Sequence, residues 1–193
     1  MKRKRSKAVR ALALLAVLFA GVQLFTHIAK SSPYDRLMGA IERGDVAAVK
    51  VELNKGTDPN NLPPAQDEPI APLCAAAGDG NLEIVALLLD RGANIDIGDS
   101  WDYTPLEAAA TNNRIQVMEL LLARGASVND DGDGGSYSLW RAAVEGKLEA
   151  VQWLLAHGAN PNTKADDGQT LLSVVEGFHH GTIATALKKS GAK

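Results

Sequence analysis

Three leucine-rich runs recur along the chain in one register, and each ends at a Gly-Ala pair. The runs occupy residues 84–93, 117–126 and 150–159. Their leucines fall at helical spacing, and glycine commonly ends a helix because it adopts positive φ without a Cβ clash. The closing glycines, Gly92, Gly125 and Gly158, are equally spaced, and Gly191 follows at the same interval. A fixed period of this length predicts a stack of repeats.

A second, alanine-rich block precedes each leucine-rich run. The blocks occupy residues 71–77, 104–110 and 137–143. In the clearest copy, the Thr104 hydroxyl can cap a helix whose first position is Pro105, and small alanines follow. A face of small side chains lets a second helix pack close. Each period is therefore expected to hold two short helices, followed by a polar turn.

The two blocks in this order resemble the ankyrin repeat, whose signature is Thr-Pro-Leu-His-x-Ala-Ala followed by Leu-Leu-x-x-Gly-Ala. The resemblance covers roughly residues 34–193 and implies an all-α solenoid of about five helix-turn-helix repeats with finger-like turns. It assigns repeats to residues 34–68, 69–98, 99–131, 132–164 and 165–193. The signature histidine is replaced in successive repeats by Cys74, Glu107, Trp140 and Ser173.

The terminal repeats depart from this pattern. Gly56 precedes Gly92 by more than one period, so three extra residues are expected in the proline-rich loop that follows a degenerate first repeat. In the last repeat the outer helix carries polar residues, as a solvent-facing cap should. These are Thr182, Thr185, Lys188 and Lys189.

Residues 1–30 have the layout of an export signal or membrane anchor. Six basic residues within positions 2–10 precede an apolar stretch from Ala11 to Phe25. That stretch spans about 22 Å as a helix, and residues 11–29 span about 28 Å against a bilayer core of about 30 Å. The length of this stretch is therefore compatible with two forms of the protein. One is a soluble periplasmic protein cleaved near Ser31, and the other is a protein anchored in the inner membrane. An internal basic amphipathic helix is the alternative to export.

Charge separates the N-terminal segment from the repeats. Seven of the 20 Lys and Arg residues lie in positions 1–30 and all 23 acidic residues follow, so residues 31–193 carry a net charge of −10. This charge disfavours nucleic acid and anionic lipid and favours a protein partner with a basic surface. The single cysteine, Cys74, excludes an internal disulfide and is expected to pack inside an inner helix, with a reactive thiol as the alternative.

Residues that the repeat pattern leaves unexplained gather in the third and fourth turns and the neighbouring inner helices. Trp, Tyr and Arg dominate the energetics of protein interfaces. The alternative is that the tryptophans pack between repeats and the aspartates are ordinary turn residues. The predicted partner-binding residues are Asp99, Trp101, Asp102, Tyr103, Thr111, Asn112, Asp131, Asp133, Tyr137, Trp140, Arg141, Val144 and Glu145.

The sequence contains little evidence of a metal site or of a catalytic site. Asp131 and Asp133 alternate as calcium ligands do, but the position of the EF-hand glutamate holds Ala142. His179 and His180 are adjacent rather than one helical turn apart. No phosphate loop, nucleophile elbow or zinc-protease motif occurs. We therefore expect no metal, no cofactor and no enzymatic activity.

The resemblance and the N-terminus together predict a non-enzymatic protein-interaction module that acts outside the cytoplasm. One specific form is an inhibitor or immunity protein whose acidic surface blocks a basic toxin or enzyme. The alternative is a membrane-anchored structural or maintenance protein of the cell envelope, with membrane contact only through residues 11–29. A hydrolase without a recognisable motif is the weakest of the three hypotheses.

Overall fold

The computed structural model describes most of the chain after residue 31. The described residues are 32–63, 69–98, 103–129, 136–165 and 167–193. The predicted export signal or anchor, residues 1–30, lies outside them. Within the described ranges the chain forms ten α-helices, and its β-structure is one isolated bridge between Lys164 and Thr170. None of these helices combines the length and apolar character that a membrane crossing requires.

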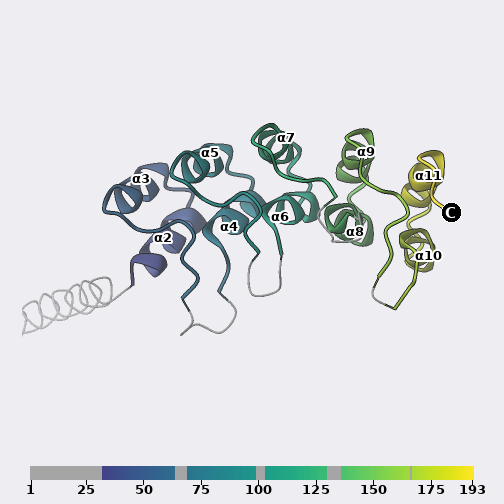
Figure 1. Ribbon diagram of the computed structural model, residues 1–193, viewed down its shortest axis with the longest axis horizontal. Helices are drawn as coiled ribbons and strands as arrows, with labels where there is room; N and C mark the ends of the chain where they lie inside the picture. The colour runs from purple at the N-terminus through teal and green to yellow at the C-terminus, as the bar shows by residue number, and fades with distance from the viewer. Residues whose placement is uncertain (1–31, 64–68, 99–102, 130–135, 166) are drawn as a thin grey trace, which may run out of the picture.

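The helices form five pairs, which confirms the prediction of about five helix-turn-helix repeats. The first, or inner, helices are α2 (Pro33–Glu42), α4 (Pro72–Asp79), α6 (Pro105–Thr111), α8 (Tyr137–Val144) and α10 (Leu171–Gly177). The second, or outer, helices are α3 (Val46–Asn54), α5 (Leu82–Asp90), α7 (Ile115–Ala123), α9 (Leu148–Ala156) and α11 (Gly181–Lys189). Figure 1 shows them as two rows, with the loops that join successive pairs extending beyond the inner row.

A side-chain cap begins inner helix α6 where the sequence predicts it. Thr104 accepts a hydrogen bond from the Glu107 backbone N–H, the Glu107 carboxylate accepts from the Thr104 N–H, and Pro105 takes the first helical turn. Ser32 and Asp35 form the same capping box at α2. Each box satisfies two backbone donors that a helix start leaves unpaired. The predicted Thr104 cap is confirmed.

The equally spaced glycines end the outer helices in the left-handed conformation, as predicted. Gly92, Gly125, Gly158 and Gly191 have φ of 85°, 101°, 89° and 95°. Gly56, which is out of register, has φ of 88° and plays the same role after α3. Since a Cβ is strained at these angles, the period reflects a backbone requirement.

Small side chains of the inner helices form the centre of the stack. Ala76, Ala109 and Ala142 occupy equivalent positions of α4, α6 and α8, and all are fully buried. Neighbouring inner helices can approach closely because these side chains are short. Cys74 belongs to the same core with 2% of its surface exposed, and its thiol donates to the Tyr103 carbonyl at 3.1 Å. The predicted packing of this cysteine is confirmed.

Polar bridges tie one repeat to the next along the loops. An asparagine side chain donates to the closing glycine of the following repeat and accepts a backbone N–H two residues later, at 2.7–3.4 Å. The three asparagines are Asn60, Asn129 and Asn162. Asp96 holds the equivalent position after α5, where a carboxylate cannot donate. At that junction Arg124 of the following repeat pairs with Asp90 at 2.9 Å.

The last outer helix is polar on its outside. Ile183, Ala184 and Leu187 face the core. The four residues predicted to face solvent, Thr182, Thr185, Lys188 and Lys189, are all exposed. The outer helix of the last pair therefore has the exposed polar side that its sequence predicts.

Candidate functional site

A hollow of about 300 Å³ opens on inner helix α8. It is lined by Tyr137, Trp140, Arg141, Val144 and Glu145. All five residues are among those predicted to bind a partner. Their spacing of three, four and seven residues places them along one stripe of the helix. The opposite stripe, with Leu139 and Ala142 fully buried, holds the helix on the core.

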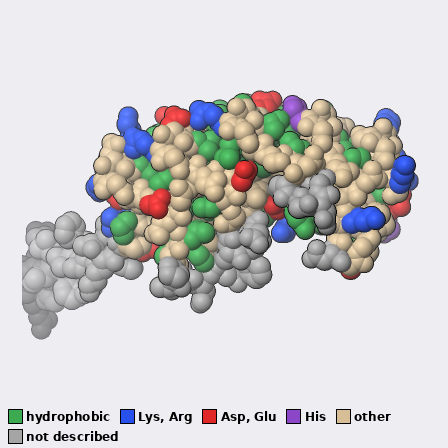
Figure 2. Space-filling model, in the orientation of Figure 1, with side chains coloured by type: hydrophobic (Ala, Val, Ile, Leu, Met, Phe, Trp, Pro, Cys, Tyr) green, Lys and Arg blue, Asp and Glu red, His purple; other side chains and the backbone are tan. Residues whose placement is uncertain are grey.

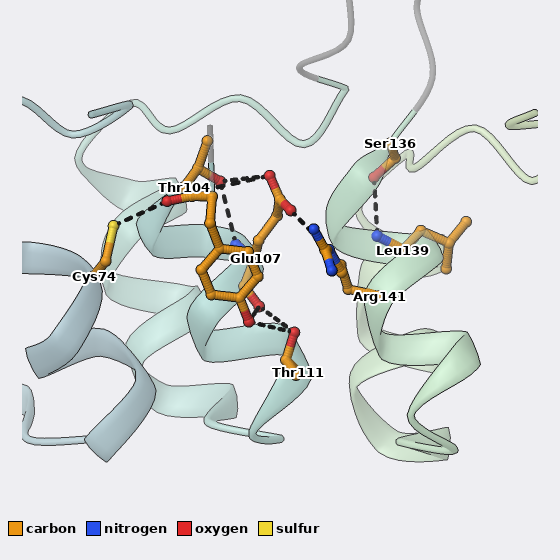
Figure 3. A network of polar contacts seen from close by, with 8 residues as sticks. Cys74, Thr104, Glu107, Thr111, Ser136, Leu139 and Arg141 are labelled. Atoms are coloured by element: carbon orange, nitrogen blue, oxygen red, sulfur yellow. Dashed lines mark hydrogen bonds and ion pairs between the residues drawn. The ribbon is translucent and has the colours of Figure 1, made fainter. Parts of the chain in front are cut away.

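The start of α8 is held by a buried serine. Ser136 is fully buried, and its hydroxyl accepts the Leu139 N–H at 3.2 Å, which caps the helix (Figure 3). Its own backbone N–H donates to the Thr163 hydroxyl, in the loop between α9 and α10, at 3.0 Å. Tyr137 follows directly and is 40% exposed, whereas Trp140 is half-buried and also packs on the hydrophobic core. The aromatic wall of the hollow therefore stands on a helix whose start is fixed by a buried cap and by the loop between α9 and α10.

A closed polar network lies on the preceding inner helix. The Tyr103 hydroxyl donates to the Thr111 hydroxyl at 2.7 Å, which donates in turn to the Glu107 carbonyl at 2.8 Å. Burial raises the pKa of Tyr103 above its ordinary value of 10.0 and outweighs the opposing effect of the bond to Thr111. Tyr103 and Thr111 thus direct their hydroxyl groups to each other.

The Glu107 side chain joins this network to the hollow. Glu107 is only 3% exposed, and its carboxylate pairs with Arg141 of α8 at 3.4 Å (Figure 3). The Arg141 guanidinium carbon also lies 5.1 Å from the centre of the Tyr103 ring, within the range of a cation–π interaction. Since the Arg141 side chain remains 49% exposed, it can complete the wall of the hollow while paired with Glu107.

The predicted partner-binding residues therefore fall into four sets. The five residues of α8 and its C-cap line the hollow, while Tyr103 lies against Arg141 and is hydrogen-bonded to Thr111. Asn112 is exposed, and its amide donates to the Ala108 carbonyl at the end of its own helix. The remaining five, Asp99, Trp101, Asp102, Asp131 and Asp133, lie outside the described residues.

Glu107 is the residue that sequence reasoning missed. It entered only as a replacement for the signature histidine, yet it connects α6 to α8 through Arg141. The spacing Thr104-x-x-Glu107 is a capping-box pattern and could have indicated its position at the helix start. The pair with Arg141, which belongs to the next repeat, leaves no local sequence signal.

The histidines form no metal site with neighbouring ligands in the described ranges. There, no group of three His, Cys, Asp or Glu side chains is placed to hold a metal ion. His180 contacts the Val144 carbonyl at 3.2 Å through its ring Nε2. His157 is exposed, and its ring stacks on Trp153 at 3.8 Å between centroids.

Charged side chains are spread along the visible face of the described residues (Figure 2). Acidic and basic groups alternate there rather than gathering into one patch of a single sign. Aromatic and polar groups on one helix stripe, rather than a charged patch, thus distinguish α8 as the candidate site.

Comparison with protein families supports the repeat assignment. A family model described as ankyrin repeats (3 copies) matches residues 37–132, and one described as ankyrin repeats (many copies) matches residues 139–181. No curated protein matches the chain. The two matches run from α2 to the start of α11 and include both α6 and α8.

Proposed function

The chain belongs to the ankyrin-repeat family, and we propose that it binds a basic protein partner through helix α8 and the neighbouring loops. Ankyrin repeats indicate a protein-interaction module. The helices contact one another through their buried stripes, so the solvent-facing stripes and the loops between pairs remain for a partner.

The hollow on α8 is the observation that carries the proposal. Tyr137, Trp140 and Arg141 combine large contact area with polar groups, which is the composition of binding hot spots. The Arg141 side chain is held by Glu107 before any partner arrives, so little conformational entropy is lost when it is contacted. A wall of this kind favours the insertion of a partner side chain.

The loop composition supports a basic partner. Four segments between helix pairs, residues 64–68, 99–102, 130–135 and 166, contain eight of the 23 acidic residues and no Lys or Arg. These four segments therefore carry most of the net charge of −10 after residue 31. Acidic segments of this kind would attract a basic protein and accelerate its association at low salt.

The N-terminus supports a place of action outside the cytoplasm. The basic residues before Ala11 and the apolar stretch after it would direct the repeats across the membrane into the periplasm. An acidic binding module in that compartment would serve as an inhibitor or immunity protein against a basic toxin or enzyme. This form of the proposal adds a biological role to the same binding surface.

A capture experiment tests the binding surface. The full chain with a C-terminal tag is compared with W140A and with W153A, since Trp153 lies on outer helix α9 and is partly buried against the core. The same envelope protein should be retained by the wild type and by W153A and lost with W140A. Equal recovery with all three proteins would overturn the assignment to α8.

The membrane-anchored alternative rests on the same N-terminal stretch. Residues 11–29 could span about 28 Å if they are retained as a helix. Mass spectrometry of the mature chain separates the two forms. A start near Ser31 indicates a soluble periplasmic binder, while an intact N-terminus indicates a protein anchored in the inner membrane.

A further inference from the structure

We infer that the hollow on α8 receives the side chain of a lysine or arginine from the partner. The inference rests on the proposed function and specifies the chemistry of that site. Its basis is the combination of two aromatic rings, an aliphatic side chain and a carboxylate in one lining. Each of these groups matches one part of a long basic side chain.

The size of the hollow suits a single side chain. Its volume of about 300 Å³ is at the lower end of the range of roughly 300–1,000 Å³ for small-ligand pockets. The lining residues run from Tyr137 to Glu145, a rise of about 12 Å along the helix. One extended side chain can lie along this length, whereas a folded peptide segment would need more room.

The aromatic and aliphatic walls fit the stem and the head of a basic residue. Lysine and arginine carry methylene groups that pack on apolar surface while the charged end stays near solvent. Val144 offers such a surface, and the faces of Trp140 and Tyr137 attract a cation through their ring electrons. Neither a carboxylate nor a neutral polar side chain would gain both contacts.

The charge balance of the lining favours a cation. Arg141 is the one basic group of the lining, and its charge is offset by Glu107 at 3.4 Å. Glu145 then remains as the carboxylate that this pair does not balance. In the described part of the chain no ion pair of Glu145 is found. A lysine or arginine entering beside Trp140 would meet this carboxylate at the C-terminal end of α8, where the helix dipole also favours positive charge.

The inference is tested by NMR titration of the full chain with blocked amino acids. N-acetyl-arginine and N-acetyl-lysine methylamides should shift the Trp140 indole N–H signal saturably at millimolar concentrations, and W140F assigns that signal. The norleucine derivative, which keeps the stem without the charge, should bind several-fold more weakly. The glutamate derivative should leave the signal in place.

Two carboxylate variants provide the matched comparison. E145Q should weaken arginine and lysine binding about two- to fivefold, the effect of one partly exposed ion pair. E119Q removes an exposed carboxylate from outer helix α7 and should leave the affinity unchanged. The loss with E145Q alone would support the inference.

Two results would overturn the inference, and both are separable from failure of the proposed function. Equal binding of norleucine and arginine would make the hollow a site for apolar side chains. The absence of any Trp140 shift with the basic probes would remove the hollow as a side-chain site. In either case the capture comparison of W140A with W153A still decides whether α8 binds a protein partner.

Discussion

Helices α6 and α8 hold equivalent places in successive repeats, but the side chains along one stripe of the two helices differ. Glu107 of α6 corresponds to Trp140 of α8, and Ala108 corresponds to Arg141. On α6 the stripe is closed, because Arg141 reaches back from the next repeat to pair with Glu107. On α8 the stripe is open and forms the hollow.

The repeats that follow the two helices also differ. The position of Arg141 is taken by Val174 in α10, a shorter and uncharged side chain. Within the described residues the lining of the hollow comes from α8 and its C-cap alone. The ion pair on α6 therefore depends on a side chain of the next repeat, and α8 has no equivalent of it among the described residues.

The largest expected loss of stability comes from truncating the core leucine that α6 and α8 have in common. Leu106 and Leu139 are equivalent core residues, 2% and 0% exposed. L106A and L139A should each lower the free energy of unfolding by about 3 kcal/mol, because each leaves a cavity in the same core. Urea unfolding followed by circular dichroism measures this, with L82A, at a position 42% exposed, as the control of small effect. A much smaller cost for L139A would show that α8 packs less firmly than α6.

The next effect is specific to the closed stripe of α6. E107A removes the capping box with Thr104 and leaves Arg141 without its carboxylate, so it should cost about 2 kcal/mol. E119A removes an exposed glutamate from α7 and should change stability by less than about 0.5 kcal/mol. If E107A and E119A unfolded at the same midpoint, Glu107 would not be the link between the two helices.

The turns after the inner helices should respond to an added methyl group in opposite directions. Gly146, after α8, has φ of 71°, and a Cβ there would meet the His180 ring at 3.1 Å. G146A should therefore cost about 1–2 kcal/mol. Gly177 ends α10 in open space without positive φ, so G177A should stabilise the protein by about 0.5 kcal/mol. Thermal unfolding of the two variants tests the sign of each change.

The smallest effect is a pH dependence that belongs to the α6 network. The pKa of Tyr103 is raised in the folded state, so its contribution to stability is complete below the unfolded value of 10.0 and is lost as the pH rises through the raised pKa. The stability difference between wild type and Y103F should therefore shift against the wild type above about pH 10. Tyr34, whose pKa burial also raises, is present in both proteins and cancels in the comparison. If the stability difference between wild type and Y103F did not change with pH, the pKa of Tyr103 would not be raised by folding.

Much of the fold could be predicted because the repeat imposes local requirements on the chain. Gly92 and its equivalents supply positive φ, and the Thr104 hydroxyl with Pro105 starts a helix. These features act within a few residues of sequence, so each could be recognised without knowing what lies opposite. The residues lining the hollow were also predicted, since the period left Trp140 and its neighbours without a structural role.

The division of the predicted site into a hollow and a supporting network could not be predicted in this way. Tyr103 and Thr111 were grouped with Arg141 as partner-binding residues, yet their hydroxyls bind each other. The Glu107 to Arg141 pair joins residues of two different repeats and depends on how α6 and α8 stack. Side-chain reach between repeats is a property of the assembled stack.

Sequence alone was enough to predict about five repeats, the start of a helix at Thr104 and the glycines that end the outer helices. It could do so because capping, glycine conformation and helical periodicity are set by neighbours along the chain. That Glu107 of α6 is paired while the lining of α8 stays open could be seen only in the stacked repeats. The pair joins side chains of two different repeats, and Val174, at the position of Arg141 in α10, carries no charge with which to form an equivalent pair.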